Sequence, residues 1–145
     1  MSDAAHQSYE NHARYVPAYH FLLFAILLVN LIWSVVMLVR APSVGTSVGL
    51  LLAAGLVLIA WYLRAFATKV QDRVIRLEEA LRYQRILPPE LQARAAALTV
   101  RQIVSLRFAS DAELPGLVRR ALDEKLGGKA IKLAIKTWRP DFLRA

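Results

Sequence analysis

The sequence lacks cysteine altogether, and two long stretches of it lack charge. The absence of cysteine excludes disulfides, thiolate metal ligands and cysteine nucleophiles. No Asp, Glu, Lys or Arg occurs at residues 15–39 or 41–63, and core helices of soluble proteins rarely extend so far without a charge. A chain of 145 residues is also too short for most enzyme folds with large pockets. It can hold one domain, or a membrane hairpin with a small domain.

The two uncharged stretches predict an all-α membrane protein built on a two-helix transmembrane hairpin. A bilayer core of about 30 Å needs roughly 20 apolar helical residues, and residues 21–39 and 44–63 supply 19 and 20. We expect a hairpin over residues 19–63, with helices at about 20–40 and 44–63, after an N-terminal cytoplasmic segment at 1–18. A buried hairpin in a soluble fold is the alternative. A cleaved signal peptide fits poorly, because its apolar region is usually about 7–15 residues long.

The distribution of charge predicts the orientation of the hairpin. Residues 64–145 hold 17 of the 19 basic side chains and 9 of the 11 acidic ones, so this part carries the whole net charge of +8. Cytoplasmic flanks of membrane helices carry the excess of Lys and Arg. We therefore expect both termini to lie in the cytoplasm.

The second helix is predicted to continue beyond the membrane. Residues 56–87 contain neither Gly nor Pro, which predicts one helix of roughly 40 residues with a cytoplasmic extension at 64–87. The stripe of apolar residues on one face of this extension covers about two heptads, short of the three or four that define a coiled coil. We expect the stripe to receive the C-terminal helices, with pairing to a second copy as the alternative. Its members are Phe66, Val70, Val74, Leu77 and Leu81.

Residues 88–145 are predicted to form a small cytoplasmic bundle of short helices. Two patterns have the spacing of capping boxes and predict helix starts: Thr99 with Gln102, and Ser110 with Glu113. A glycine pair predicts the end of the helix that follows the second box: Gly127 and Gly128.

The last predicted helix has an apolar face and a basic face. The apolar face consists of Ile131, Ala134, Ile135 and Trp138, and the basic face of Lys129, Lys132 and Lys136. Such a helix can lie on an anionic membrane, at about 1 kcal/mol for each basic residue near the headgroups, with Trp138 at the same surface. A helix packed on the core with a solvated basic face explains the same pattern.

Small and polar residues indicate where the two membrane helices meet. Gly45, Gly49 and Ala53 form a stripe that lets helix backbones approach closely in lipid. Asn30 and Ser34 lie four residues apart on the first helix and can hydrogen-bond across the contact. The stripe serves packing within the hairpin or, alternatively, a contact with a second copy or a partner subunit.

Aromatic side chains gather at the predicted cytoplasmic boundary, where Trp and Tyr rings prefer to lie. They serve as membrane anchors, with one interfacial histidine. The alternative is a docking segment that lies against residues 64–73 and presents a surface to a partner. The residues concerned are Tyr9, Asn11, His12, Arg14, Tyr15, Tyr19, His20, Trp61 and Tyr62.

The sequence indicates neither an enzyme nor a nucleic-acid-binding protein. A metal site needs several converging His or carboxylate ligands, and the predicted spans hold one histidine and no carboxylate. There is no Gly-rich phosphate loop and no GxSxG pattern. The membrane orientation rule already explains the basic charge, and acidic residues are interspersed with it. We expect no catalytic residue, metal, cofactor or nucleic-acid partner.

Three segments resemble a family of small bacterial membrane proteins of unknown function, some of which are labelled transporter permeases. They are QSYENHARYVP at residues 7–17, RLEEALRY at 76–83 and LRFASDAEL at 106–114. The resemblance covers nearly the whole chain and implies a two-span inner-membrane protein with a cytoplasmic helical tail. Two spans alone cannot form the usual permease bundle. The family brings no established activity or catalytic residues.

Two functions from different classes agree with these patterns. The first, which we favour, is a non-catalytic accessory subunit or scaffold that contacts other membrane proteins, or a second copy, through its helices. The alternative is a membrane-surface regulator or sensor that binds anionic lipid headgroups with its basic C-terminal helix.

Overall fold

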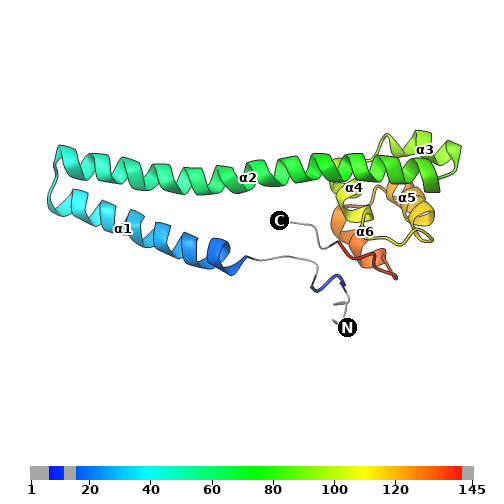
Figure 1. The fold of residues 1–145 in the computed structure, drawn as a ribbon, viewed down its shortest axis with the longest axis horizontal. Coiled ribbons are helices and arrows are strands. Elements are labelled where there is room, and N and C mark those ends of the chain that lie inside the picture. The colour runs from blue at the N-terminus through cyan, green and yellow to red at the C-terminus, as the bar shows by residue number, and fades with distance from the viewer. Residues whose placement is uncertain (1–6, 12–15, 142–145) are drawn as a thin grey trace. The chain divides into compact units, whose positions relative to one another are not determined.

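The computed structural model describes residues 7–11 and 16–141 (Figure 1). The chain divides into a hairpin unit, residues 15–68, and a helical unit that joins residues 1–14 to 69–145. The described part is all helical apart from one isolated β-bridge, as the sequence predicts. Its elements are the π-helical turn η1 (Ala18–Leu23), α1 (Phe24–Arg40), α2 (Val44–Ile86), α3 (Pro89–Ala95), α4 (Val100–Leu106), α5 (Leu114–Asp123) and α6 (Gly128–Ala134).

In the hairpin unit, α1 and the first half of α2 run antiparallel and are joined by a short turn (Figure 1). The turn is closed by reciprocal hydrogen bonds between Ser43 and Thr46. The Thr46 backbone N–H donates to Ser43 Oγ at 3.1 Å, and the Ser43 N–H donates to Thr46 Oγ1 at 2.9 Å. Because these bonds satisfy N–H groups that a helix start leaves unpaired, they explain why α2 begins at Val44.

The apolar side chains of the hairpin unit are mostly exposed. The helical segments Ala18–Arg40 and Val44–Ile86 are each long and apolar enough to cross a membrane. In their most apolar windows, 6% and 11% of the residues are buried within the protein. The buried residues include Leu27, Ala53 and Ala60. A core helix of a soluble protein buries most of its apolar residues, and these two helices do not.

The prediction of one long helix is confirmed, because α2 runs for 43 residues. The prediction that its apolar stripe receives the C-terminal helices is wrong. The stripe residues Phe66, Val70, Val74, Leu77 and Leu81 are between 49% and 65% exposed. The buried residues of α2 in the helical unit lie on another face: Ile75, Glu79, Arg82 and Tyr83. This face can be buried because its two charges are paired, as described below.

The helical unit has one apolar core, to which α3, α4, α5 and α6 contribute. Its fully buried large side chains come from α3, α4, the α4–α5 connection, α5 and α6: Leu91, Leu106, Phe108, Leu114, Val118 and Ile131. Tyr83 and Leu87 add the end of α2 and the residue after it to this core.

One of the two predicted capping boxes forms. The Gln102 N–H donates to Thr99 Oγ1 at 3.3 Å, and the Thr99 N–H donates to Gln102 Oε1 at 2.8 Å, so α4 starts as predicted. The second box forms only in part: the Glu113 N–H donates to Ser110 Oγ at 3.4 Å, but the Glu113 side chain does not return the bond, and α5 starts later, at Leu114. The Glu113 carboxylate instead accepts hydrogen bonds from the backbone N–H groups of Lys136 and Thr137 at 3.2 Å.

The glycine pair does not end α5. The helix ends at Asp123, and Lys125 takes a left-handed conformation with φ of 50°. The Leu126 N–H then donates to the Ala121 carbonyl at 3.2 Å, which is the Schellman pattern. Gly127 is the N-cap residue of α6, and Gly128 is its first residue.

The last helix is shorter than predicted. It ends at Ala134, and Ile135 is extended, so Lys136 and Trp138 do not belong to it. Trp138 instead forms an antiparallel bridge with Ala109, and its ring lies 5.0 Å from that of Phe108 between centroids. The Arg139 N–H donates to the Phe108 carbonyl at 2.7 Å, which holds this segment against the α4–α5 connection.

Close packing at the start of α6 predicts a stability difference between the two glycines. A Cβ at Gly128 would lie 2.7 Å from Ser105 Oγ and 3.3 Å from the Arg101 carbonyl oxygen, whereas a Cβ at Gly127 meets nothing within 4 Å. We expect Gly128→Ala to destabilise the helical unit by about 1–3 kcal/mol, as overpacking does. Gly127→Ala is the matched control and should cost less. Adding Ser105→Ala to Gly128→Ala should restore part of the loss.

Tryptophan fluorescence can report on the helical unit alone. The chain has three tryptophans, Trp33, Trp61 and Trp138, so a Trp33→Phe/Trp61→Phe background leaves Trp138 as the reporter. Thermal unfolding of the full chain in detergent then measures each glycine variant. Equal losses for both glycine variants would contradict the packing argument.

Candidate functional site

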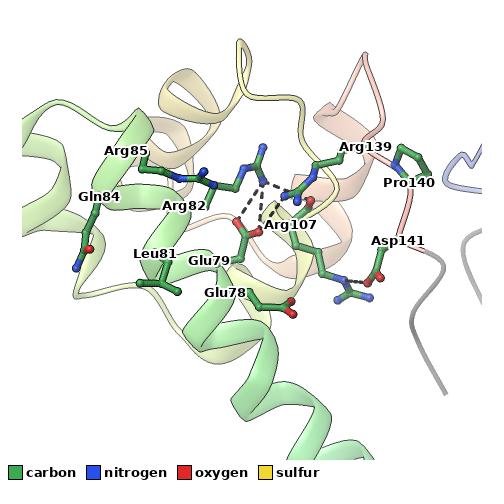
Figure 2. Close-up of a pocket in the computed structure, with 10 residues that line it drawn as sticks. All are labelled: Glu78, Glu79, Leu81, Arg82, Gln84, Arg85, Arg107, Arg139, Pro140 and Asp141. Carbon is green, nitrogen blue, oxygen red and sulfur yellow. Dashed lines mark hydrogen bonds and ion pairs between the residues drawn. The ribbon is translucent and has the colours of Figure 1, made fainter.

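A buried arginine on α2 forms the centre of the most polar site in the helical unit (Figure 2). Arg82 is 3% exposed and donates to Asp111 Oδ1 from Nε at 2.9 Å and from Nη2 at 2.6 Å. Nη2 also donates to the Ala109 carbonyl at 2.6 Å, and Nη1 donates to the Glu79 carboxylate at 3.2 Å. An unpaired charge is very costly to bury, so these partners explain why an arginine can occupy a core face.

Glu79 lies one helical turn before Arg82 and is also buried. Its carboxylate faces Arg82 and, at 3.5 Å, Nη1 of Arg139 (Figure 2). Burial raises the pKa of Glu79 above its ordinary value, because desolvation outweighs the opposing charges of Arg82 and Arg139. Burial and the Glu79 charge likewise raise the pKa of Tyr83, whose hydroxyl has no hydrogen-bond partner among the residues that the structure describes. Tyr83 is therefore neutral in the folded protein.

A second buried arginine extends the site toward the chain ends. Arg107 Nε donates to Asp141 Oδ2 at 2.8 Å, and its Nη1 donates to the Val104 carbonyl at 2.7 Å. Its guanidinium carbon also lies 4.1 Å above the centre of the Phe108 ring, within range of a cation–π contact. The Asp141 N–H donates to Gln7 Oε1 at 2.7 Å, so the network joins residues near both ends of the chain.

An open groove of about 900 Å³ runs beside this ion network, which we define as Glu79, Arg82, Arg107, Asp111, Arg139 and Asp141. The described residues that line the groove include no hydroxyl, imidazole or thiol side chain. In the described part of the chain, no group of three or more His, Asp or Glu side chains could hold a metal ion. The arginines and carboxylates of the network already pair with one another. The arrangement is suited to fixing segments of the chain together.

The residues predicted for helix packing are partly brought together. Ala53 is buried and Gly49 is half-buried, whereas Gly45 is exposed beside the turn. Asn30 is exposed, and the Ser34 hydroxyl donates to the Asn30 carbonyl along α1 at 2.9 Å. The sequence argument missed Ala60, which is buried and whose carbonyl accepts a hydrogen bond from the Tyr19 hydroxyl. Its seven-residue spacing from Ala53 could have indicated it.

The predicted docking residues fall into three groups. His12, Arg14 and Tyr15 lie outside the described residues. Tyr9 is half-buried, and Asn11 Oδ1 accepts a hydrogen bond from the Ser8 N–H at 2.6 Å. In the hairpin unit, His20 Nδ1 lies 3.0 Å from the Val16 backbone nitrogen and its ring contacts Tyr19, while Trp61 and Tyr62 are exposed.

The predicted lipid-surface residues do not form one helical face. Lys129 and Lys132 lie on α6, and Lys136 follows it. Lys132 is half-buried, with Nζ 5.7 Å from the centre of the Phe108 ring. Trp138 packs on the same ring. The tryptophan predicted to lie at the membrane surface thus contributes to the core of the helical unit.

Sequence reasoning missed the ion network. Periodicity treats Glu79 and Arg82 as solvated charges, because it cannot detect that Asp111 lies beside them from 29 residues away. One signal was present. Two of the three segments that carry the family resemblance contain members of the network, namely the Glu79–Arg82 pair and the turn from Arg107 to Asp111. The third contains Gln7, which is bonded to the network residue Asp141.

The fold and site define an all-helical protein in which two helices are long and apolar enough to span a membrane and a small helical unit is fixed by the ion pairs of two buried arginines. Comparison with family models identifies it further. Over residues 1–145 the chain matches the family described as "Family of unknown function (DUF6526)", and it belongs to that family. No curated protein and no solved structure matches the chain.

Removing the central guanidinium should destabilise the helical unit strongly. We expect Arg82→Met to cost about 3–5 kcal/mol, because it leaves the Glu79 carboxylate buried without its nearest partner. Arg85→Met, at an exposed position of the same helix, is the matched control and should change stability by less than about 0.5 kcal/mol. Trp138 fluorescence in the background described above measures both. Similar losses for the two variants would show that Arg82 carries no special role.

The raised pKa of Glu79 predicts a pH dependence. A carboxyl whose pKa is higher in the folded than in the unfolded state holds its proton longer when folded, so it contributes stability at low pH that is lost as pH rises through the folded pKa. We expect wild type to lose stability relative to Glu79→Gln as pH rises from about 4.5, the ordinary value, toward 7. The measurement is Trp138-monitored unfolding at several pH values. A relative gain by wild type over this range would mean that the arginines dominate over burial.

Proposed function

We propose that this protein is a non-catalytic, integral inner-membrane accessory subunit or scaffold of a bacterial cell. In this proposal, α1 and the first half of α2 cross the membrane, both termini lie in the cytoplasm, and the helical unit serves as a binding module. Its partners are other membrane proteins or a second copy of the chain.

The observation that carries the proposal is the exposure of the apolar helices. The most apolar windows of both helices bury very few of their residues within the protein, and Trp33, Leu51 and Ile59 are each more than 60% exposed. Water would make such a surface strongly unfavourable, whereas lipid accepts it. The backbone hydrogen bonds of both helices are satisfied within the helix, which a lipid environment requires.

The distribution of charge supports the orientation. The turn between the helices contains no charge after Arg40, whereas the sequence after Leu63 holds the whole net charge of +8. Basic flanks favour the cytoplasmic side.

The ion network supports a binding role in preference to a catalytic one. Its carboxylates and guanidinium groups are held by one another and by backbone carbonyls. A network closed in this way rigidifies a surface, and the two buried arginines bring α2, α4 and the segment after α6 into one unit.

Labelling of single cysteines tests the topology, because the wild-type chain has no cysteine. Pro42→Cys probes the exposed turn of the hairpin, and Ala97→Cys probes an exposed turn of the helical unit. We expect a membrane-impermeant maleimide to label Pro42→Cys in intact spheroplasts and Ala97→Cys after lysis alone. Both variants should stay in the membrane fraction after alkaline extraction. Release by alkali, or the reverse labelling, would contradict the proposal.

Copurification from the same membranes tests whether the protein acts as a scaffold. The tagged wild-type chain, extracted gently and purified, should retain at least one other chain in a fixed ratio. Arg82→Met should lose it, because opening the helical unit removes the binding surface, and Arg85→Met should keep it. Wild-type protein that purifies alone would count against a scaffold.

A further inference from the structure

The polar half of α2 has an exposed apolar face that the helical unit does not cover. This face consists of Val70, Val74, Leu77 and Leu81, which are 62%, 49%, 65% and 56% exposed. Apolar patches of this kind on a protein surface mark interaction sites. Val100 on α4 and Leu133 on α6 are isolated exposed residues on other helices, and scattered single residues of that kind need no partner.

The apolar face points away from the buried face of the same helix. Ile75, Glu79 and Arg82 recur at spacings of four and three and pack into the helical unit. At about 100° per residue, the centres of the two stripes lie roughly 140° apart around the helix axis. Because Arg82 is bonded to Asp111 and Ala109, the helical unit is fixed to one side of α2. The other side is left for a different occupant.

The spacing of the apolar face is the heptad spacing of a coiled coil. Val74 and Leu81 take the heptad position a, and Val70 and Leu77 take position d. A β-branched residue at a with Leu at d favours two parallel strands. The central pair, Val74 and Leu77, has this pattern, and the outer pair, Leu81 at a and Val70 at d, has the reverse one. In sequence, the same register continues backward to Ala67 and Leu63, which are also exposed.

The charges beside the apolar face identify its partner. In this register Arg73 occupies position g and Glu78 position e, and both are exposed. In a parallel pair, g of one helix faces the e position five residues later on the other, so Arg73 of one copy meets Glu78 of the second, twice by symmetry. In an antiparallel pair g faces g and e faces e, so Arg73 and Glu78 would not meet in this way. The complementarity is of this chain to itself.

We propose that a second copy of this chain covers this face, and that the two α2 helices pair in parallel along residues 63–81. The inference rests on the proposed function, since two copies inserted with the same orientation present their helices in parallel. It also explains how fewer than three heptads can suffice, because anchoring in one membrane raises the effective concentration of the partner helix.

Cysteine crosslinking of the full chain in native membranes tests the proposal. We expect Leu77→Cys, in the centre of the face, to form a disulfide-linked product with the mass of two chains under mild oxidation. Arg76→Cys is the matched control, because it is the neighbouring exposed residue and lies off the stripe. No product from Leu77→Cys, equal products from both variants, or a product of another mass would overturn the assignment to a second copy.

Charge exchange gives a second test that does not depend on oxidation. On the Leu77→Cys background, Arg73→Glu and Glu78→Arg should each reduce the dimer product several-fold, because each places like charges at the g and e positions. The double variant restores opposite charges and should recover the product. If the double variant instead gave even less dimer product than either single variant, the proposed parallel register would be wrong.

The pairing of α2 and the membrane scaffold are tested separately. Correct labelling of Pro42→Cys and Ala97→Cys without a Leu77→Cys dimer overturns the pairing and leaves the membrane scaffold standing. Incorrect labelling overturns the proposed function itself.

Discussion

The burial of the Arg82 guanidinium is the constraint on which the helical unit depends. A charge removed from water needs several well-placed acceptors, and here they come from Glu79 on the same helix and from the segment containing Ala109 and Asp111. These bonds fix where the α4–α5 connection crosses α2. Arg139 then reaches Glu79, and its backbone is bonded to Phe108, so the end of the described chain closes over the same pair.

This constraint also decides which face of α2 remains open. An amphipathic helix normally turns its apolar stripe to the core and its charges to water, but α2 buries Glu79 and Arg82 and exposes Val70, Val74, Leu77 and Leu81. The arrangement is understandable if the exposed stripe also has a partner. In our proposal one helix serves three surroundings: lipid along its apolar half, its own helical unit on one side of the polar half, and a second copy on the other.

Features set by neighbouring residues were predictable from the sequence, and features set by distant ones were not. The two long helices, the start of α4 at Thr99 and the all-helical class follow from local composition and caps. The buried face of α2 depends on Asp111, 29 residues away from Arg82. Glu113 was expected to cap its own helix, but it binds the backbone of Lys136 and Thr137. The sequence predicts a helix end at Gly127 and Gly128, whereas α5 ends at Asp123, because Lys125 adopts the positive φ of 50° that a glycine would favour.

Native mass spectrometry of the protein, extracted gently from its own membrane, tests the central claim most directly. The claim is that the open face of α2 is occupied by a second copy within a membrane assembly. The account predicts particles that contain two 16.3 kDa chains, with or without other subunits. Particles that contain a single copy, whether alone or with foreign subunits, would contradict it.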